Sequence, residues 1–568
     1  MRNSRSVFSL LSIVFTSYVL AAPQDRSPKL GRDDCSFDSA DSPNCWGAYS
    51  LDTNYYDDGP STGVTREYFF EIQEGTAAFD GFSRDVMTVN GQFPGPTIEA
   101  DWGDDIVVHV TNSVPNNGTS LHWHGVRQYL SNDHDGVASV TQCPLASGQS
   151  MTYKWHASQY GHSWYHSHYS LQAWNGVIGG IVIRGPATAP YDIDEGILVL
   201  SDWFHDTTDR LWQSAARLGK PPVAQNGLIN GTNVYGGSGN RFETSFTTGK
   251  RHRFRIVNTA MDTFFKFSID NHNLTVIAND FVPIEPFTTD VLSIGVGQRY
   301  DVIVEADQPK GDYWMRAVPD TACSTENDSQ NNIKGIVRYN QFSNSDPTST
   351  AYDVTMDCLE PSSSLVPYLS LDVSSPAQTS EFELGDNTSA TTGIFTWSLN
   401  GQSFLGNWSS PTLQQVVDED SEFEASENVY EVNHKQSFVY IVVQNDPSVP
   451  IAHPIHLHGH DFWVLAQGSD AVYTSDVSLE LNNPPRRDVA MLAANGYLVI
   501  GFVTDNPGVW LLHCHIGWHA SQGFSLQILE RESEIADLVS ASDIQDTCSA
   551  WEAYQAGDKK VFQQDSGI

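Results

Sequence analysis

Four short clusters contain ten of the nineteen histidines in this chain, and one of them encloses a cysteine. Imidazole and thiolate ligands suit transition metals, copper first among them, whereas calcium and magnesium prefer oxygen ligands. The composition of the clusters therefore predicts a site for transition metals. The clusters are His122-Trp123-His124, His166-Ser167-His168, His453-Pro454-Ile455-His456-Leu457-His458, and His513-Cys514-His515 with His519.

The spacing within the clusters indicates how the ligands would be shared. Residues i and i+2 of a β-strand face the same side, so each His-X-His pair would project two imidazoles together. Cys514 would then face away from His513 and His515. One strand could therefore present a thiolate to one metal and two imidazoles to another, with a short covalent path for electrons between them.

The number and types of ligands distinguish between a structural zinc site and copper sites. A structural zinc site needs four ligands, is usually rich in thiolate and is closed, so eleven ligands with one cysteine do not fit it. Two histidines and a cysteine with a weak axial neighbour describe a blue-copper electron-transfer site, and His453, Cys514 and His519 supply that set. The eight remaining histidines are enough for a three-copper cluster. Four coppers together could hold the four electrons that reduction of dioxygen to water requires.

These four clusters closely resemble the ligand signatures of the multicopper oxidases, and within them the laccases, from about residue 60 to the C-terminus. The resemblance implies four copper ions. A type 1 copper would be bound by His453, Cys514 and His519, and a type 2 copper by His122 and His456. A type 3 pair would be bound by His124, His166 and His515 on one copper, and by His168, His458 and His513 on the other.

The resemblance also places the axial neighbour of the type 1 copper ten residues after the cysteine, at Phe524. Phenylalanine cannot coordinate a metal. Without a thioether donor the oxidised copper is less stabilised, which predicts a relatively high type 1 potential.

Three acidic residues are candidates for proton transfer. The segment Arg255-Ile256-Val257-Asn258-Thr259-Ala260-Met261-Asp262 resembles the laccase segment that places a carboxylate near the type 1 histidine, so Asp262 would accept a phenolic proton as a general base. Asp135 and Asp488 resemble acidic residues that assist proton delivery to the trinuclear site. The alternative for Asp262 is a solvated loop aspartate.

The last four residues, Asp565-Ser566-Gly567-Ile568, resemble the C-terminal tail of ascomycete laccases, which plugs the solvent channel to the trinuclear site. The alternative is a frayed terminus.

Strand signals dominate the elements that must position these ligands. Residues 105–110, 253–257 and 438–443 are β-branched or alternating runs closed by turns containing asparagine, and long periodic helices are scarce. A segment that begins with Gly and has Trp two or three residues later recurs at 161–166, 311–316 and 508–513, and the middle copy carries no histidine. The pattern predicts an all-β chain of three related domains, the second without metal. The resemblance implies that these are cupredoxin-like Greek-key barrels or sandwiches.

The domain boundaries follow from composition. The first 22 residues have Arg2 and Arg5, an apolar run and small residues at Ala21 and Ala22, as secretory signals do. A stretch rich in Ser, Thr, Asp and Pro near residue 355 suggests a connection. We expect a signal peptide at 1–22, an N-terminal extension at 23–60, a first domain with trinuclear ligands at 61–187, a second with the substrate pocket at 188–355, and a third with the type 1 site at 356–568.

Charge and hydropathy limit the possible partners. Thirty basic against sixty-nine acidic residues give a net charge of −39, which opposes binding to nucleic acids or anionic membranes. No apolar run after the signal approaches membrane-spanning length. We expect a secreted, extracellular protein, monomeric, with dioxygen and small phenols or aromatic amines as its partners.

Cysteines and sequons fit a secreted protein. Seven cysteines leave one odd thiol, and Cys514 between two histidines is the obvious exception. Short loops favour Cys35 with Cys45 and Cys323 with Cys358, which leaves Cys143 with Cys548, although sequence alone cannot choose among the pairings. Six asparagines match the glycosylation acceptor pattern and are expected at the surface: Asn117, Asn230, Asn273, Asn327, Asn387 and Asn407.

Three functions remain to be compared. The first is a laccase, which oxidises phenols or aromatic amines by one electron at the type 1 site and reduces dioxygen to water. The second is a multicopper oxidase with another reductant, such as ferrous iron, ascorbate, bilirubin or a pigment precursor. The third is a copper protein that only carries electrons or stores copper, which would need only the type 1 ligands and leaves the eight other histidines without a purpose.

Overall fold

A computed structural model of the protein describes residues 44–339, 343–389, 393–420, 422–448, 451–557 and 560–568. The expected signal peptide, most of the expected N-terminal extension and Cys35 lie outside the described residues. The expectation of an all-β chain is confirmed, because the sheets carry most of the ordered structure and the helices are short.

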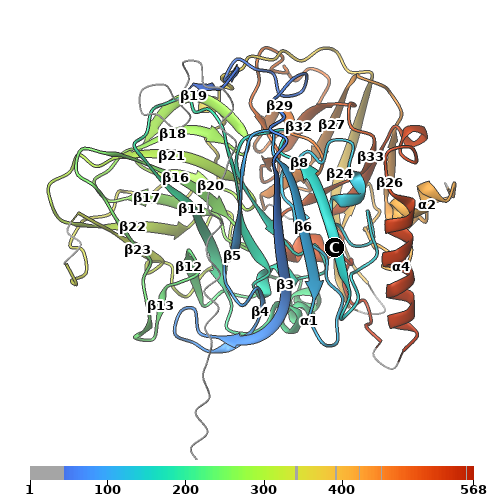
Figure 1. The fold of residues 1–568 in the computed structure, drawn as a ribbon, viewed down its shortest axis with the longest axis horizontal. Coiled ribbons are helices and arrows are strands. Elements are labelled where there is room, and N and C mark those ends of the chain that lie inside the picture. The colour runs from blue at the N-terminus through green and yellow to red at the C-terminus, as the bar shows by residue number, and fades with distance from the viewer. Residues whose placement is uncertain (1–43, 340–342, 390–392, 421, 449–450, 558–559) are drawn as a thin grey trace, which may run out of the picture.

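The strands fall into three groups along the chain, each with two sheets (Figure 1). The first group has sheets of order β4-β3-β6-β8 and β5-β10-β9-β7. Its strands are β3 (Thr65–Ala77), β4 (Arg84–Val89), β5 (Gly95–Asp101), β6 (Asp105–Asn112), β7 (His122–Trp123), β8 (Ser150–His156), β9 (Gly161–His166) and β10 (Ile178–Arg184).

The second group has sheets of order β12-β11-β16-β21-β18-β19 and β15-β23-β22-β17-β20. Its strands are β11 (Ile193–Trp203), β12 (Asn226–Ile229), β15 (Glu243–Ser245), β16 (Arg251–Asn258), β17 (Phe265–Ile269), β18 (Leu274–Asn279), β19 (Val282–Thr289), β20 (Leu292–Ile294), β21 (Arg299–Glu305), β22 (Asp312–Pro319) and β23 (Lys334–Arg338).

The third group has sheets of order β25-β24-β27-β32-β29-β30 and β26-β34-β33-β28-β31. Its strands are β24 (Gln378–Thr388), β25 (Phe395–Leu399), β26 (Val429–Val432), β27 (Phe438–Gln444), β28 (His453–Leu457), β29 (Phe462–Gly468), β30 (Arg486–Arg487), β31 (Val489–Leu492), β32 (Tyr497–Val503), β33 (Gly508–Cys514) and β34 (Ser525–Glu530).

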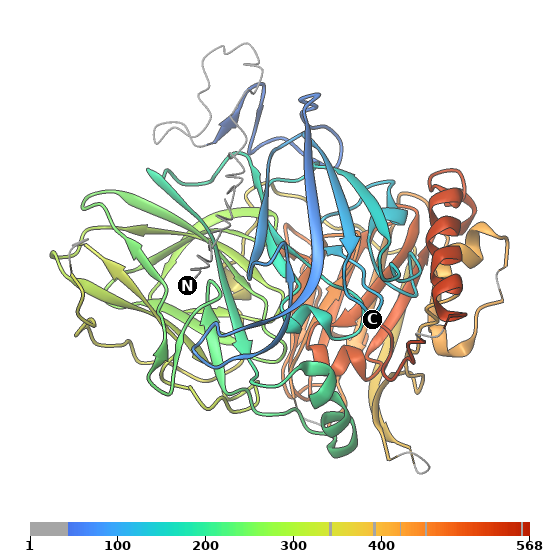
Figure 2. The ribbon, with the colours of Figure 1, turned by 60° about the horizontal axis from the view of Figure 1, so that its bottom comes forward.

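Outside the three groups, the described residues form two two-stranded sheets, four α-helices and five short 3₁₀-helices. In Figure 2 the longest helix, α4, runs along the outer edge of the third group. The small sheets pair β1 (Cys45–Trp46) with β2 (Tyr49–Ser50) and β13 (Val234–Tyr235) with β14 (Ser238–Gly239), and the helices are α1 (Thr208–Leu218), α2 (Thr412–Val417), α3 (Gly517–Ser521) and α4 (Ala541–Gln555).

The sequence repeat occupies the same place in all three groups. Its copies form β9, β22 and β33, and each of these strands lies between an earlier strand, β7, β17 or β28, and the next strand of the chain, β10, β23 or β34. Equivalent segments therefore lead into equivalent positions, and in the first and third groups these positions carry histidines.

Two expected disulfides are confirmed and one lies partly outside the described residues. Cys143 bonds to Cys548 of α4 across 405 positions, and Cys323 bonds to Cys358. Cys514 is free and buried, as predicted. The bridge from Cys143 lies in an apolar core shared by the first group, β33 and α4, with Leu511 and Trp551 among its members.

The expectation of a surface position is wrong for one sequon. Asn327 is 5% exposed, and its side-chain Nδ2 donates to the carbonyl oxygen of Asn226 at 2.9 Å. The pattern alone could not show this, because it does not record the neighbours of the side chain.

The described residues include no helix with the length and apolar character needed to cross a membrane.

Candidate metal centre

The predicted type 1 ligands meet in one place, which we call the cysteine site: His453, Cys514 and His519. His453 begins β28, Cys514 ends the neighbouring β33, and His519 lies in α3 a few residues later. The Cys514 Sγ lies 3.6 Å from His453 Nδ1 and 3.5 Å from His519 Nδ1, and the two Nδ1 atoms are 3.1 Å apart. All three side chains are buried.

The other eight ligand candidates form a second group, which we call the histidine cluster: His122, His124, His166, His168, His456, His458, His513 and His515. Strand register brings them together, because His122 pairs with His166 and His456 pairs with His513 across their strands.

Within the histidine cluster, ligand atoms of different chain segments come close. His515 Nε2 lies 3.2 Å from His124 Nδ1, and His458 Nε2 lies 3.3 Å from His513 Nε2. The expected type 3 set His168, His458 and His513 has ligand atoms within 4.8 Å of one another. His122 is close both to His124 with His166 and to His456 with His458.

Alternation along β33 separates the two sites. Cys514 contacts the imidazoles of the cysteine site, whereas His513 beside it contacts His458 in the histidine cluster. His513 Nδ1 also donates to the carbonyl oxygen of Cys514 at 2.9 Å. The two sites are therefore joined both by the backbone and by this hydrogen bond.

Two buried aspartates contact the ring nitrogens of imidazoles in the histidine cluster. Asp135 accepts from His458 Nδ1 at 2.9 Å and lies 3.2 Å from His122 Nδ1. Asp488 accepts from His124 Nε2 at 3.2 Å through Oδ1 and from His456 Nδ1 at 2.7 Å through its carbonyl oxygen. Such bonds fix which nitrogen carries the proton and which faces the centre of the cluster.

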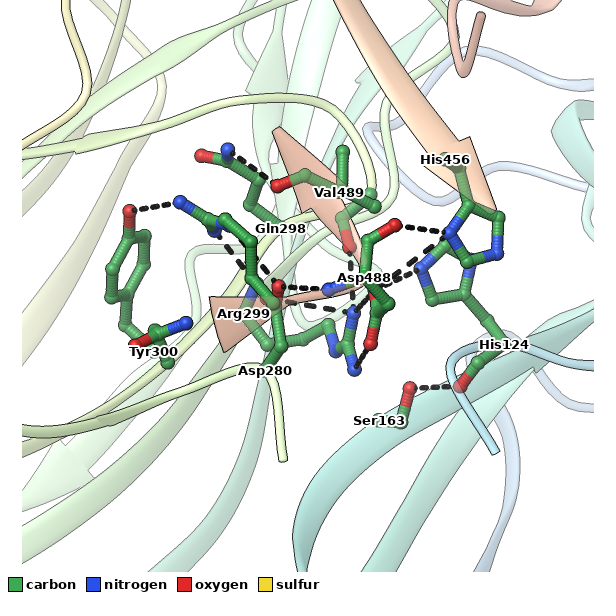
Figure 3. Close-up of polar contacts among 12 residues, drawn as sticks. His124, Ser163, Asp280, Gln298, Arg299, Tyr300, His456, Asp488 and Val489 are labelled. Atoms are coloured by element: carbon green, nitrogen blue, oxygen red, sulfur yellow. Dashed lines mark hydrogen bonds and ion pairs between the residues drawn. The ribbon is translucent and has the colours of Figure 1, made fainter. Parts of the chain in front are cut away.

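The second group of strands contributes a charge network that contacts Asp488 (Figure 3). Arg299 pairs with both carboxylate oxygens of Asp488, one of them at 2.6 Å. Asp280 accepts from the backbone nitrogens of Arg299 at 3.0 Å and Asp488 at 3.1 Å. Arg487 pairs with Asp280 at 3.2 Å and with Glu360 at 2.7 Å. Burial raises the pKa of Asp488 to about 7, although Arg299 opposes this shift.

Asp262 lies in a loop fastened to the cysteine site. The carboxylate of Asp202 accepts from the backbone nitrogens of Met261 at 2.9 Å and Asp262 at 3.0 Å. The Met261 carbonyl accepts from Gly517, the first residue of α3, at 2.9 Å. Asp262 itself is 5% exposed and accepts from the backbone of Thr325 at 3.0 Å. This burial contradicts the alternative of a solvated aspartate, and it raises the pKa of Asp262 to about 6.

Aromatic rings close the other side of the cysteine site. Phe524 is fully buried, and its ring centre lies 5.0 Å from that of His453. Trp397 of β25 lies 5.2 Å from His453 and 4.8 Å from His519, ring centre to centre. These rings exclude water from the site and offer the metal no donor atom on this side.

Comparison with known proteins identifies the family of this chain. Residues 71–188, 194–341 and 401–534 each match a family model described as multicopper oxidase. The chain is 47% identical to laccase-2 of Botryotinia fuckeliana over 99% of each chain, and 41% identical to a laccase of Neurospora crassa over 92% of this chain and 88% of the relative. The chain belongs to the multicopper oxidase family.

Solved structures agree with this multicopper oxidase in fold. The laccase of Botrytis aclada is 47% identical, covers 93% of this chain and 99% of its own, and superposes with a TM-score of 0.90. A multicopper oxidase that functions in iron import is 26% identical over 86% of this chain and 95% of its own, with a TM-score of 0.79. These relatives make the chain a copper-binding oxidoreductase of the laccase type.

The donor set of this multicopper oxidase fits copper on independent grounds. Five imidazole nitrogens of the histidine cluster are buried without a hydrogen-bond partner among the described residues: His122 Nε2, His166 Nε2, His168 Nδ1, His456 Nε2 and His515 Nδ1. Burial lowers the pKa of His166, His168 and His456 well below the usual value, so these imidazoles are neutral and free to bind a cation. Burial raises the pKa of Cys514, and a coordinated metal would deprotonate it.

The C-terminal tail of this multicopper oxidase, residues 565–568, is packed rather than frayed. Its Ser566 donates through Oγ to the carbonyl oxygen of Ala520 at 2.8 Å and through its backbone nitrogen to that of Ser521 at 2.9 Å, and these two residues follow His519 at the end of α3. Asp565 accepts a hydrogen bond from Ser170, two residues after His168. The tail therefore contacts segments that carry ligands of both sites.

Sequence reasoning missed Arg299, Asp280, Asp202 and Trp397 in this multicopper oxidase. Each lies far along the chain from any histidine cluster, in an ordinary strand or turn. No local signal marks them, since their roles come from contacts between separate strand groups.

Proposed function

We propose that this laccase-type oxidase takes single electrons from phenols or aromatic amines at the cysteine site and reduces dioxygen to water at the histidine cluster, with four bound copper ions. Copper supplies a one-electron acceptor at the first site and electron donors to dioxygen at the second. The observation that carries the proposal is the convergence of all eleven expected ligands into two buried sites joined by His513-Cys514-His515.

We assign the ligands as the sequence suggests: His453, Cys514 and His519 for type 1, His122 and His456 for type 2, and the other six histidines for the type 3 pair. His513 and Cys514 then belong to different sites although they are consecutive. Electrons can cross along the Cys514 backbone and its hydrogen bond with His513 without passing through solvent.

Asp262 would act as the proton acceptor for the reductant. A phenol loses its electron more easily as its proton leaves, so a carboxylate close to the cysteine site assists the oxidation. A pKa near 6 makes Asp262 more basic than an ordinary aspartate and leaves most of its carboxylate ionised above about pH 6, where it can receive that proton.

Asp135 and Asp488 would orient imidazoles and hold protons beside the histidine cluster. Asp135 contacts two imidazoles directly, and Asp488 contacts two more through its carboxylate and carbonyl oxygens. Dioxygen reduction consumes protons, and carboxylates at these positions could supply them.

Oxygen uptake with a panel of reductants tests the proposal. Protein of known copper content is given a phenol, an aromatic amine, ferrous iron or ascorbate, and the kcat/KM for each is compared. A preference for the phenol and the amine, with one dioxygen consumed per four electrons, is expected. A preference for ferrous iron or ascorbate would replace the proposed reductant, and absence of oxygen uptake by the copper-loaded protein would indicate an electron carrier.

The compartment and the assembly state are part of the same proposal. An N-terminal signal, two disulfides and several exposed sequons suit a secreted glycoprotein. We propose extracellular action as a monomer.

A further inference from the structure

A cavity of about 530 Å³ lies between the first strand group, α1 and the C-terminal segment 561–565. Four aromatic residues line it: Tyr169, Trp212, Trp408 and Phe562. Asn117 also lines this cavity, and it is the acceptor residue of the sequon Asn117-Gly118-Thr119. A space of this size is in the range that holds small organic ligands.

The side-chain nitrogen of Asn117, Nδ2, is available for attachment of a sugar. Its Oδ1 accepts from the Tyr169 hydroxyl at 3.0 Å and from the backbone of Gly118 at 3.0 Å. Within the described part of the chain, no hydrogen bond of Asn117 Nδ2 is found, and the side chain is half-buried. Nδ2 is the atom to which an N-linked sugar is attached. Asn327 differs, because its Nδ2 is buried and already donates to a carbonyl.

The lining of the cavity suits a sugar. The apolar face of a pyranose can pack on the rings of Trp212 and Trp408, which removes apolar surface from water. Both tryptophans line the cavity, with Trp212 7% and Trp408 6% exposed. Glu74, Asp209 and Asp565 offer acceptors for sugar hydroxyls.

We propose that Asn117 carries an N-linked glycan whose first N-acetylglucosamine residues occupy this cavity and brace the C-terminal tail. In the secretory pathway, Asn117 Nδ2 forms a bond to the anomeric carbon of a lipid-pyrophosphate-linked oligosaccharide. The carbon–oxygen bond to the pyrophosphate breaks, and the amide proton is lost as the lipid pyrophosphate leaves. The inference does not depend on copper or on the proposed reductant.

A chain of contacts connects the sequon to the tail. Tyr169, which holds Asn117, stacks on Trp408 with ring centres 4.5 Å apart. Trp408 Nε1 donates to the carbonyl oxygen of Gly567 at 2.9 Å. On the opposite wall, Gln213 of α1 donates to Gln564 at 3.1 Å. A sugar between these walls therefore contacts both α1 and the segment that leads into the tail.

The first test compares glycans on the folded, copper-loaded protein secreted by a eukaryotic host. Peptide mapping by mass spectrometry measures occupancy at Asn117 and at Asn273, an exposed sequon. A peptide N-glycosidase then acts without denaturant, and release is followed at each site. We expect both sites to be occupied and release at Asn117 to be at least about 10-fold slower, because the linkage is sheltered. An unoccupied Asn117, or release as fast as at Asn273, would overturn the proposal.

The second test measures bracing of the tail by hydrogen–deuterium exchange of peptides covering 560–568. Asn117→Gln, which lacks the glycan, should exchange about 10-fold faster than the parent protein. Asn273→Gln controls for loss of a glycan elsewhere, and Tyr169→Phe controls for loss of the hydrogen bond to Asn117 while keeping the sequon. Both controls should exchange as the parent does. Equal exchange in Asn117→Gln and the parent, or equally fast exchange in Asn117→Gln and Tyr169→Phe, would show that the sugar does not hold the tail.

Discussion

Arg299 and Asp488 form a two-point ion pair directly behind the imidazoles of His124 and His456. Arg299 comes from the second strand group, Asp488 and His456 from the third, and His124 from the first. The second group thus supports the histidine cluster through charge, although none of the expected metal ligands belongs to it. A strand group that carries none of the expected ligands is therefore still part of the candidate metal centre.

Arg299→Met should destabilise the protein by about 3–5 kcal/mol, because it leaves the buried Asp488 carboxylate without its cation. Denaturant unfolding measures the free energy, and copper analysis should show less metal per chain because His124 and His456 lose their fixed orientation. The control is Arg210→Met, which removes an exposed pair with Asp206 and should leave stability and copper content unchanged. Parent-like stability in Arg299→Met would refute a supporting role for the ion pair.

Asp262→Ala should lower kcat/KM for a phenol by about 10²–10⁴-fold if Asp262 is the proton acceptor. A one-electron reductant without an ionisable proton should be oxidised at nearly the parent rate. Only the ionised carboxylate can accept a proton, so phenol oxidation by the parent should fall as the pH drops below about 6. The variant should lose that step in its pH profile, and equal losses for both reductants would instead indicate a structural role.

Phe524→Met should lower the type 1 potential measured by redox titration, because a thioether beside His453 and Cys514 can donate to the oxidised copper. Phe524→Leu is the matched control, since it changes the packing without adding a donor. An unchanged potential in Phe524→Met would refute the axial assignment.

The C-terminal tail should loosen as the pH rises through about 6. Burial raises the pKa of Asp565 to about 6 in the folded protein, above the usual value of about 3.9 for an unfolded chain. The stability that the protonated Asp565 carboxyl gives to the folded tail is therefore present in full below about pH 4 and is lost as the pH rises through about 6. Hydrogen exchange of residues 560–568, corrected for the intrinsic pH dependence, measures the effect. Asp565→Asn should abolish it, and a pH-independent parent would contradict the assignment.

The sequence predicted most of the ligand geometry because that geometry is local. Alternation along a strand is enough to place Cys514 opposite His513, and the repeat that ends in His166 and His513 is enough to expect related domains. The short loop between them also favoured the pairing of Cys323 with Cys358, which the structure contains.

Contacts between segments that are distant along the chain could not be predicted from the sequence. Arg299 and Trp397 reach the two sites only after the strand groups pack together, and nothing beside them in the chain distinguishes them from ordinary core residues. The surface position expected for Asn327 was wrong for the same reason, because a three-residue pattern does not record that the Asn327 amide is buried against Asn226.

The bridge between Cys143 and Cys548 sets the order in which this protein can mature. The two cysteines are 405 positions apart, and α4 with the packed tail follows at the very end of the chain. The ligands His122 and His515 are separated almost as widely. Neither the covalent closure nor a complete ligand set can form before the third strand group has been synthesised, and a product truncated before His513 lacks expected ligands of both sites.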